Sequence, residues 1–146
     1  MKTQLALSIE FNQSGPRNQK DGKHYWLTPH DLYAALDAEF HFDFDPCPYP
    51  RPLGFDGLAV EWGQSNYVNP PFGRGAVLWA RKAVEEKKRG HLSVLVYPSN
   101  SAMACLLPEI SDNIRDLGRV RWLACEDREP AHKHHCFLIL AFVLRP

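Results

Sequence analysis

The sequence predicts one α/β domain over residues 25–146, with a mostly parallel sheet flanked by helices. The segment 92–97 is almost continuously apolar, which is typical of a parallel strand buried on both faces. Before it, residues 76–89 carry apolar side chains at helical spacing, so a helix is expected to precede that strand. A chain of 146 residues, 45% of them hydrophobic, is long enough to build one core.

Composition narrows the class of protein. Lys and Arg number 17 together, as do Asp and Glu, so no global positive charge indicates a nucleic-acid partner. The four cysteines are scattered without a Cys-x-x-Cys pair, which favours reduced thiols over a zinc site or a disulfide framework. There is no signal peptide and no apolar run near the roughly 18 residues of a membrane span. We therefore expect a cytoplasmic protein without membrane contact.

The chain starts with a polar segment, residues 1–24, that has little to bury and is expected to form a mobile arm. Contacts from its basic side chains to phosphate are the alternative role. A helix is then expected to begin at Thr28-Pro29, because Thr28 is a good N-cap and Pro29 fits the first helical position. Its inward-facing residues, at helical spacing, are Leu32, Leu36 and Phe40.

Phenylalanines alternate with polar residues over 40–45, which predicts a strand that ends at Asp45-Pro46. Ligands of open α/β sheets bind beyond the carboxyl ends of strands, so Asp45 is a candidate ligand-binding carboxylate. Forming a turn at the strand end is its alternative role. Residues 46–65 are rich in proline and glycine and predict a loop, because they are too few for a further helix–strand–helix unit.

The next strand, around Tyr67-Val68, is followed by Asn69-Pro70-Pro71-Phe72, called here the Asn-Pro-Pro-Phe motif. The side-chain carbonyl of Asn69 and the backbone carbonyl of Pro70, which has no N–H beside it, are two acceptors. Together they suit the two hydrogens of a planar amine, while Pro71 stiffens the turn and Phe72 offers a flat face for a base. An ordinary loop with two prolines and a core phenylalanine is the alternative.

Polar residues follow both neighbouring strands. Arg74, between two glycines, adjoins the motif and is placed to reach a DNA phosphate. The strand over 92–97 is followed by Ser99 and Asn100, at the same edge of the sheet as the motif. These two side chains are candidates to line a substrate cleft, with helix capping as the alternative role of the serine.

The last third of the chain is less informative. A weaker helical pattern covers 102–115, and strands are predicted over 120–124 and 136–144. The cluster formed by His132, His134, His135 and Cys136 lacks the spaced second pair of ligands that zinc sites need, so we predict no metal.

The motifs together resemble a known family. The Asn-Pro-Pro-Phe motif is similar to the catalytic motif of S-adenosylmethionine-dependent amino-methyltransferases of DNA, RNA and protein glutamine. From about residue 26 to the C-terminus, the pattern resembles the small phage-type DNA N-6-adenine methyltransferases. The motifs that carry the resemblance are Trp26-Leu27-Thr28-Pro29, Phe42-Asp43-Phe44-Asp45-Pro46-Cys47, Gly57-Leu58 with Trp62, and Asn69-Pro70-Pro71-Phe72.

The resemblance implies a minimal Rossmann-like methyltransferase fold with an antiparallel last strand at the sheet edge, S-adenosylmethionine as cofactor and DNA as substrate. A phage-encoded enzyme would methylate DNA in the host cytoplasm, with restriction–modification as the expected context. Its oligomeric state is open, and a homodimer is one option. Catalytic roles fall to Asn69, Pro70, Pro71 and Phe72. Cofactor contacts fall to Trp26, Thr28, Asp45, Pro46, Cys47 and Asn69, and nucleic-acid contacts to Phe72, Arg74, Ser99 and Asn100.

The chain departs from the wider methyltransferase pattern after Asp45, where residues 48–52 (Pro-Tyr-Pro-Arg-Pro) stand in place of a glycine-rich loop. Three alternatives therefore stay open. The substrate amine could belong to cytosine, or the substrate could be RNA or a protein glutamine. The third alternative is a non-catalytic module that binds nucleic acid or another partner.

Overall fold

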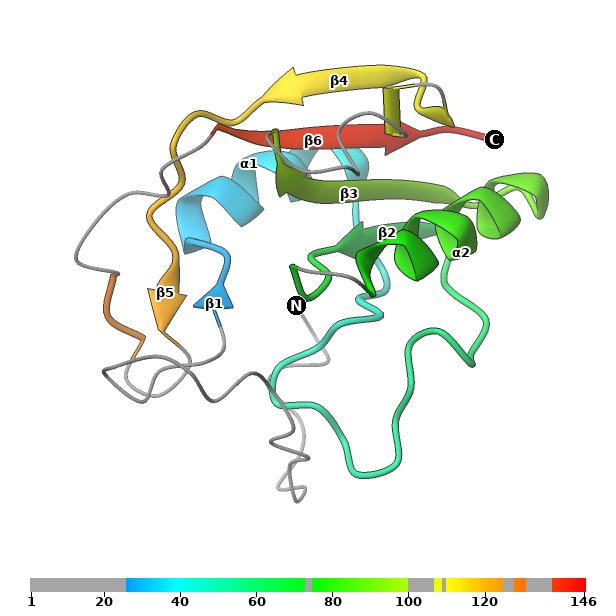
Figure 1. The fold of residues 1–146 in the computed structure, drawn as a ribbon, viewed down its shortest axis with the longest axis horizontal. Coiled ribbons are helices and arrows are strands. Elements are labelled where there is room, and N and C mark those ends of the chain that lie inside the picture. The colour runs from blue at the N-terminus through cyan, green and yellow to red at the C-terminus, as the bar shows by residue number, and fades with distance from the viewer. Residues whose placement is uncertain (1–25, 73–74, 100–106, 109, 125–127, 131–137) are drawn as a thin grey trace.

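The computed structural model describes residues 26–72, 75–99, 107–108, 110–124, 128–130 and 138–146 (Figure 1). The predicted arm, residues 1–24, lies outside these ranges. The helices are α1 (His30–Phe40) and α2 (Ala76–Lys88). The strands are β1 (Trp26–Leu27), β2 (Ser65–Val68), β3 (Leu92–Pro98), β4 (Asn113–Asp116), β5 (Leu123–Ala124) and β6 (Ile139–Leu144). Neither helix is long and apolar enough to cross a membrane.

The main sheet has the strand order β2-β3-β6-β4. The pair β2–β3 is parallel, and β6 runs antiparallel to both β3 and β4. Strands β2, β3 and β4 therefore point the same way and β6 alone opposes them, as Figure 1 shows. The predicted antiparallel last strand is confirmed.

The prediction of a mostly parallel, Rossmann-like sheet is confirmed only as an α/β fold, because the sheet is only partly parallel. The expected place of the last strand at the sheet edge is wrong, because β6 lies between β3 and β4. That insertion makes both of its ladders antiparallel and leaves β2–β3 as the parallel pair of named strands. The fold is α/β with a mixed, open, four-stranded sheet.

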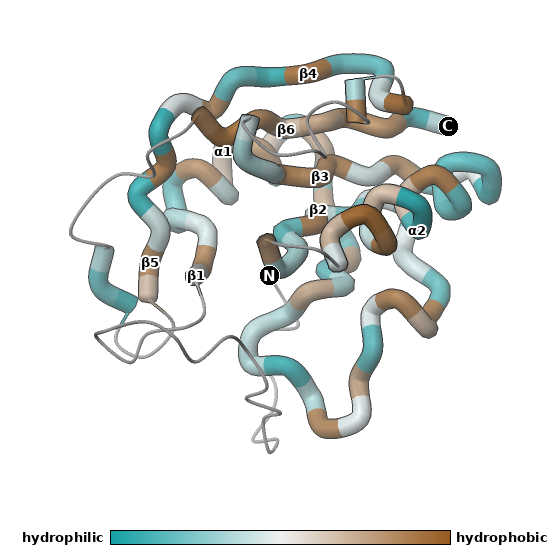
Figure 2. Tube along the Cα trace, viewed as in Figure 1, coloured by the Kyte–Doolittle hydropathy of each residue, from teal (hydrophilic) through white to brown (hydrophobic). Residues whose placement is uncertain are grey.

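Each face of the sheet is covered by one helix. On one face, Leu36 and Phe40 of α1 belong to the same buried cluster as Tyr67 and Val94. On the other face, the alanines of α2 pack with Val68 and Leu95. Successive strand residues alternate between these two clusters, as the two-residue period of a strand requires. Figure 2 shows the apolar residues concentrated along β3 and β6, between the helices.

Helix α2 confirms the helix predicted over 76–89. Its buried residues are Ala76, Ala80, Ala83 and Glu86, whereas Val77, Trp79 and Val84 are partly buried. Small alanine side chains let the helix lie close to the sheet.

The start of α1 differs from the prediction. Its N-cap is Pro29, without a side-chain cap hydrogen bond, and the hydroxyl of Thr28 bonds instead to the Tyr67 hydroxyl at 2.5 Å. The strand predicted over 40–45 is also wrong: α1 continues to Phe40, and its C-cap is His41, a left-handed residue with φ 52°. A single parallel bridge, Phe44 to Asn66, is what remains of that strand.

Two later predictions are wrong in part. Over 102–115, the described residues Leu107, Pro108 and Ile110 are helical, but Asn113–Asp116 forms the edge strand β4. The strand predicted over 120–124 shortens to β5, which leaves the main sheet and pairs with β1. The strand predicted over 136–144 is confirmed as β6 from Ile139 onward.

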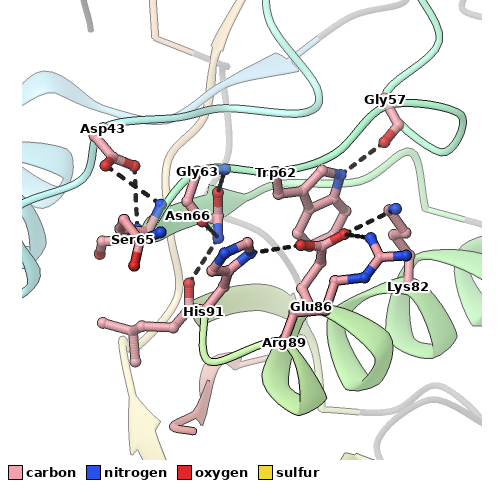
Figure 3. A network of polar contacts seen from close by, with 12 residues as sticks. Asp43, Gly57, Trp62, Gly63, Ser65, Asn66, Lys82, Glu86, Arg89 and His91 are labelled. Carbon is pink, nitrogen blue, oxygen red and sulfur yellow. Dashed lines mark hydrogen bonds and ion pairs between the residues drawn. The ribbon is translucent and has the colours of Figure 1, made fainter.

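At the amino ends of β2 and β3, a buried polar network joins the strands to α2 (Figure 3). The Glu86 side chain is fully buried, and its carboxylate contacts Lys82 Nζ at 2.8 Å, Arg89 Nη1 at 3.0 Å and His91 Nδ1 at 2.7 Å. Beside it, the Asn66 amide donates to the carbonyl of Leu92 at 2.8 Å and so ties β2 to β3. These contacts fix the end of the sheet opposite to the predicted site.

Candidate functional site

The Asn-Pro-Pro-Phe motif leaves the carboxyl end of β2, as predicted. Asn69 is half-buried, Pro70 is buried, and Pro71 and Phe72 are exposed. Within the described residues, the Asn69 side chain has no hydrogen-bond partner. The Phe72 side chain is 41% exposed, and its ring meets Tyr97 at 5.1 Å and Trp122 at 5.8 Å, both edge-on.

The Asp-Pro-Cys turn (residues 45–47) leaves the sheet beside this motif. Phe44 bridges in parallel to Asn66, and its carbonyl accepts a hydrogen bond from the Tyr67 N–H at 3.0 Å. Asp45, the next residue, is 5% exposed, and its Oδ1 accepts the N–H of Cys47 at 2.8 Å. The two predicted motifs therefore follow adjacent parallel segments at the carboxyl end of the sheet.

Asp45 lies close to hydroxyl groups from α1 and β2. The Tyr67 hydroxyl is bonded to Thr28, and the Tyr33 ring meets the Tyr67 ring edge-on at 5.1 Å. Burial raises the pKa of both tyrosines, and the negative charge of Asp45 raises them further. Thr28 and Asp45 therefore both act on the Tyr67 hydroxyl. The side chain of Trp26 lies outside what the structure describes.

Burial is the largest influence on the pKa values of this cluster. Burial raises the pKa of Asp45 to about 7, and the hydrogen bond from the Cys47 N–H only partly opposes that rise. Burial also raises the pKa of the Cys47 thiol well above its usual value, with the Asp45 charge adding to the effect. Asp45 is therefore a buried acid that would gain stability as a carboxylate from any donor placed beside it.

The motif Gly57-Leu58 with Trp62 packs against the Asp-Pro-Cys turn. A Cβ atom at Gly57 would lie 1.9 Å from the carbonyl oxygen of Pro46, so only glycine permits this approach. The Trp62 indole N–H donates to the Gly57 carbonyl at 2.7 Å and fixes that segment of the loop. Asp56 accepts the N–H of Leu58, as an ordinary turn former does.

The remaining predicted residues are less well defined. Ser99 is half-buried at the end of β3, and its N–H donates to the carbonyl of Leu138 at 2.9 Å. Arg74 and Asn100 lie outside the described residues, as does the cluster of three histidines and Cys136. In the ranges that the structure describes, no group of three or more His, Cys, Asp or Glu side chains is arranged to hold a metal ion.

Sequence reasoning missed four aromatic residues of this region: Tyr33, Tyr67, Tyr97 and Trp122. Tyr33 keeps helical spacing with Leu36 and Phe40, and Tyr67 precedes the motif by two residues. Those patterns indicate burial, but they carry no sign of a site. Comparisons with protein-family models, curated proteins and solved structures find no match to this chain.

Proposed function

We propose that the protein is an S-adenosylmethionine-dependent methyltransferase that acts on the 6-amino group of adenine in DNA. One observation carries the proposal: the buried Asp45 and the Asn-Pro-Pro-Phe motif leave adjacent parallel segments at the same sheet edge. This is the edge at which α/β sheets bind ligands. In this proposal, Asp45 is a buried acceptor for the cofactor, and the motif beside it supplies two acceptors for an amine.

Asp45 fits a cofactor that carries hydroxyl or ammonium donors. Within the described residues its carboxyl group has one hydrogen-bond partner, the Cys47 N–H, and no cation is bonded to it. A ligand donor would supply the stabilisation that burial has removed and favour the ionised form. Thr28, bonded to Tyr67 in the same cluster, would offer its hydroxyl to the same ligand.

S-adenosylmethionine would supply a methyl group already activated for transfer, so the protein mainly binds, orients and excludes water. The Asn69 side-chain carbonyl and the Pro70 backbone carbonyl would accept the two amine hydrogens and turn the nitrogen lone pair outward. Phe72 would stack on the base with its exposed face. An adenine inside a duplex cannot reach this edge, so it would be flipped out or taken from single-stranded DNA.

The first test is calorimetric titration of the protein with S-adenosylmethionine, without DNA, followed by methyl-transfer assays on adenine-rich and cytosine-rich DNA. We expect one saturable site, weakened in Asp45→Asn. The matched control is Asp43→Asn, because Asp43 accepts the N–H of Ser65 and so serves the start of β2. Equal affinity in wild type and Asp45→Asn would remove Asp45 from the site.

Asn69→Ala should slow transfer by about two to three orders of magnitude and leave cofactor affinity unchanged, since it removes one preorganised polar contact at the reacting centre. Near-normal turnover in this variant would contradict the role of Asn69. Product analysis would separate adenine from cytosine, RNA and protein glutamine as substrates.

A non-catalytic nucleic-acid-binding module is the second candidate. It is favoured by the segment that follows Asp45, where buried Pro46 and Pro48 stand in place of a glycine-rich loop. Absence of cofactor binding, both with and without DNA, would favour this candidate over the enzyme.

A further inference from the structure

Trp122 carries a buried hydrogen-bond donor that is unpaired within the described part of the chain. Its side chain is 5% exposed, and the Nε1 atom is fully buried without a hydrogen-bond partner among the described residues. Trp62 is a direct contrast, because its indole N–H donates to the Gly57 carbonyl at 2.7 Å. Buried polar groups without a partner are costly and uncommon in folded proteins, so this one calls for a physical explanation.

The position of Trp122 supplies that explanation. Its ring lies 5.8 Å from the Phe72 ring, with an interplanar angle of 67°. Phe72 also meets Tyr97 of β3 at 5.1 Å and 71°, so the motif, β3 and the segment before β5 each contribute one ring. Trp122 is fixed there because the next two residues, Leu123 and Ala124, pair with β1. The ring that carries the unpaired donor therefore packs beside the ring of Phe72.

We propose that the Trp122 indole N–H binds an acceptor atom of the target base, a ring nitrogen of adenine, and so positions that base on Phe72. This inference rests on the proposed function and extends it to a residue that holds the substrate. An indole N–H only donates, so it pairs with an acceptor nitrogen and disfavours a base edge that presents a donor at the same place. Trp122 is a positioning residue: it orients the base while Asn69 and Pro70 bind the amine.

The proposal can be tested without turnover. In ¹⁵N-labelled protein, the four tryptophans give four indole N–H signals, and Trp122→Phe identifies the signal of Trp122. The probes are two short single-stranded thymine oligonucleotides, one with a central adenine and one with an abasic position there. We expect the adenine probe to move the Trp122 signal downfield and leave the Trp62 signal in place. No shift at saturation, or an equal shift with the abasic probe, would overturn the proposal.

A kinetic arm uses the same variant. Trp122→Phe keeps an aromatic ring and removes only the indole portion that carries the N–H, so the fold should be retained. We expect a fall of about tenfold in kcat/KM, the typical effect of losing one net hydrogen bond. Replacing the matching ring nitrogen of adenine by CH should cost the wild type about tenfold and the variant nothing. Trp79→Phe, a partly buried tryptophan stacked on Trp62, is the matched control and should keep normal transfer.

The outcomes separate the two proposals. A wild type that methylates DNA, with an unchanged Trp122→Phe variant, would overturn the role of Trp122 alone. A wild type without transfer would overturn the proposed function, and the indole signal would still decide whether Trp122 binds a base. Failure of both probes to bind would overturn both.

Discussion

Two buried carboxylates mark opposite ends of the sheet, and their surroundings differ. Glu86, at the amino end, is fully buried and paired with Lys82, Arg89 and His91. Asp45, at the carboxyl end, is almost as deeply buried, yet within the described residues it has one backbone N–H as its partner.

The pKa values of the two buried carboxylates therefore shift in opposite directions. Burial acts to raise the pKa of Glu86, but hydrogen bonds from Lys82 and His91 outweigh it, so the pKa lies below its ordinary value. For Asp45, burial outweighs the hydrogen bond from the Cys47 N–H, and its pKa rises to about 7. The amino end of the sheet is completed by the protein itself, whereas the carboxyl end leaves an acid that a ligand can complete.

The strongest test of this comparison is Glu86→Gln. Removing the charge leaves the nearly buried Lys82 ammonium group without its counter-charge and weakens the contact with His91, so we expect the free energy of unfolding to fall by about 3–5 kcal/mol at pH 7. Denaturant unfolding monitored by circular dichroism measures the change. Because the pKa of Glu86 is depressed, its contribution is present above the ordinary value of 4.5 and is lost as the pH falls below it. A loss under about 1 kcal/mol at pH 7 would contradict the role of Glu86 in fixing the amino end of the sheet.

Asp45→Asn should change the free energy of unfolding in the opposite direction, towards greater stability. Since the folded pKa of about 7 lies above the ordinary 3.8, the folded protein binds more protons, and stability is lost as the pH rises through 7. Asparagine removes this loss, so the variant should exceed the wild type by on the order of 4 kcal/mol at pH 8 and match it below pH 4. Unfolding curves across that range measure the difference. A variant that is less stable than the wild type at pH 8 would show that Asp45 has a partner within the protein.

Gly57→Ala tests whether the carboxyl end depends on backbone packing. The added methyl group would meet the Pro46 carbonyl at 1.9 Å, so we expect a loss of about 1–3 kcal/mol and weaker cofactor binding as the Asp-Pro-Cys turn shifts. Gly75→Ala is the matched control, because a Cβ there has nothing within 4 Å. Equal stability of the two variants, measured by thermal unfolding, would mean that the turn can move without cost.

The sequence predicts the parts of the fold that depend on local pattern. Apolar periodicity identified α2, β3 and β6, because it records which side chains face the core. It could not place β6 between β3 and β4, since the neighbours of a strand are chosen by tertiary packing. The Thr28 cap failed for the same reason: its hydroxyl bonds to Tyr67, 39 residues away, in place of the start of α1.

The candidate site divides in the same way. Asp45 and the Asn-Pro-Pro-Phe motif were predictable because their residue types and positions after strands indicate ligand binding. Trp122 and Glu86 were not. A glutamate in a helix usually indicates a solvent-exposed face, and an unpaired indole N–H is visible only when its neighbours are known.

The smallest expected effect is that of Arg89→Ala, and its comparison with Lys82→Ala distinguishes an exposed partner of Glu86 from a buried one. Arg89 contacts the same carboxylate oxygen as Lys82, but the Arg89 side chain is 52% exposed and that of Lys82 is 11% exposed. Water screens the exposed pair, so Arg89→Ala should lower the free energy of unfolding by less than about 1 kcal/mol, and Lys82→Ala should lower it by more. Added salt should reduce the Arg89 effect further and leave most of the Lys82 effect, because screening acts mainly on exposed charges. Equal losses of stability in the two variants would mean that the number of cations beside Glu86, and not their burial, sets the strength of its ion pairs. The contrast between Glu86 and Asp45 would then not depend on how deeply each partner is buried.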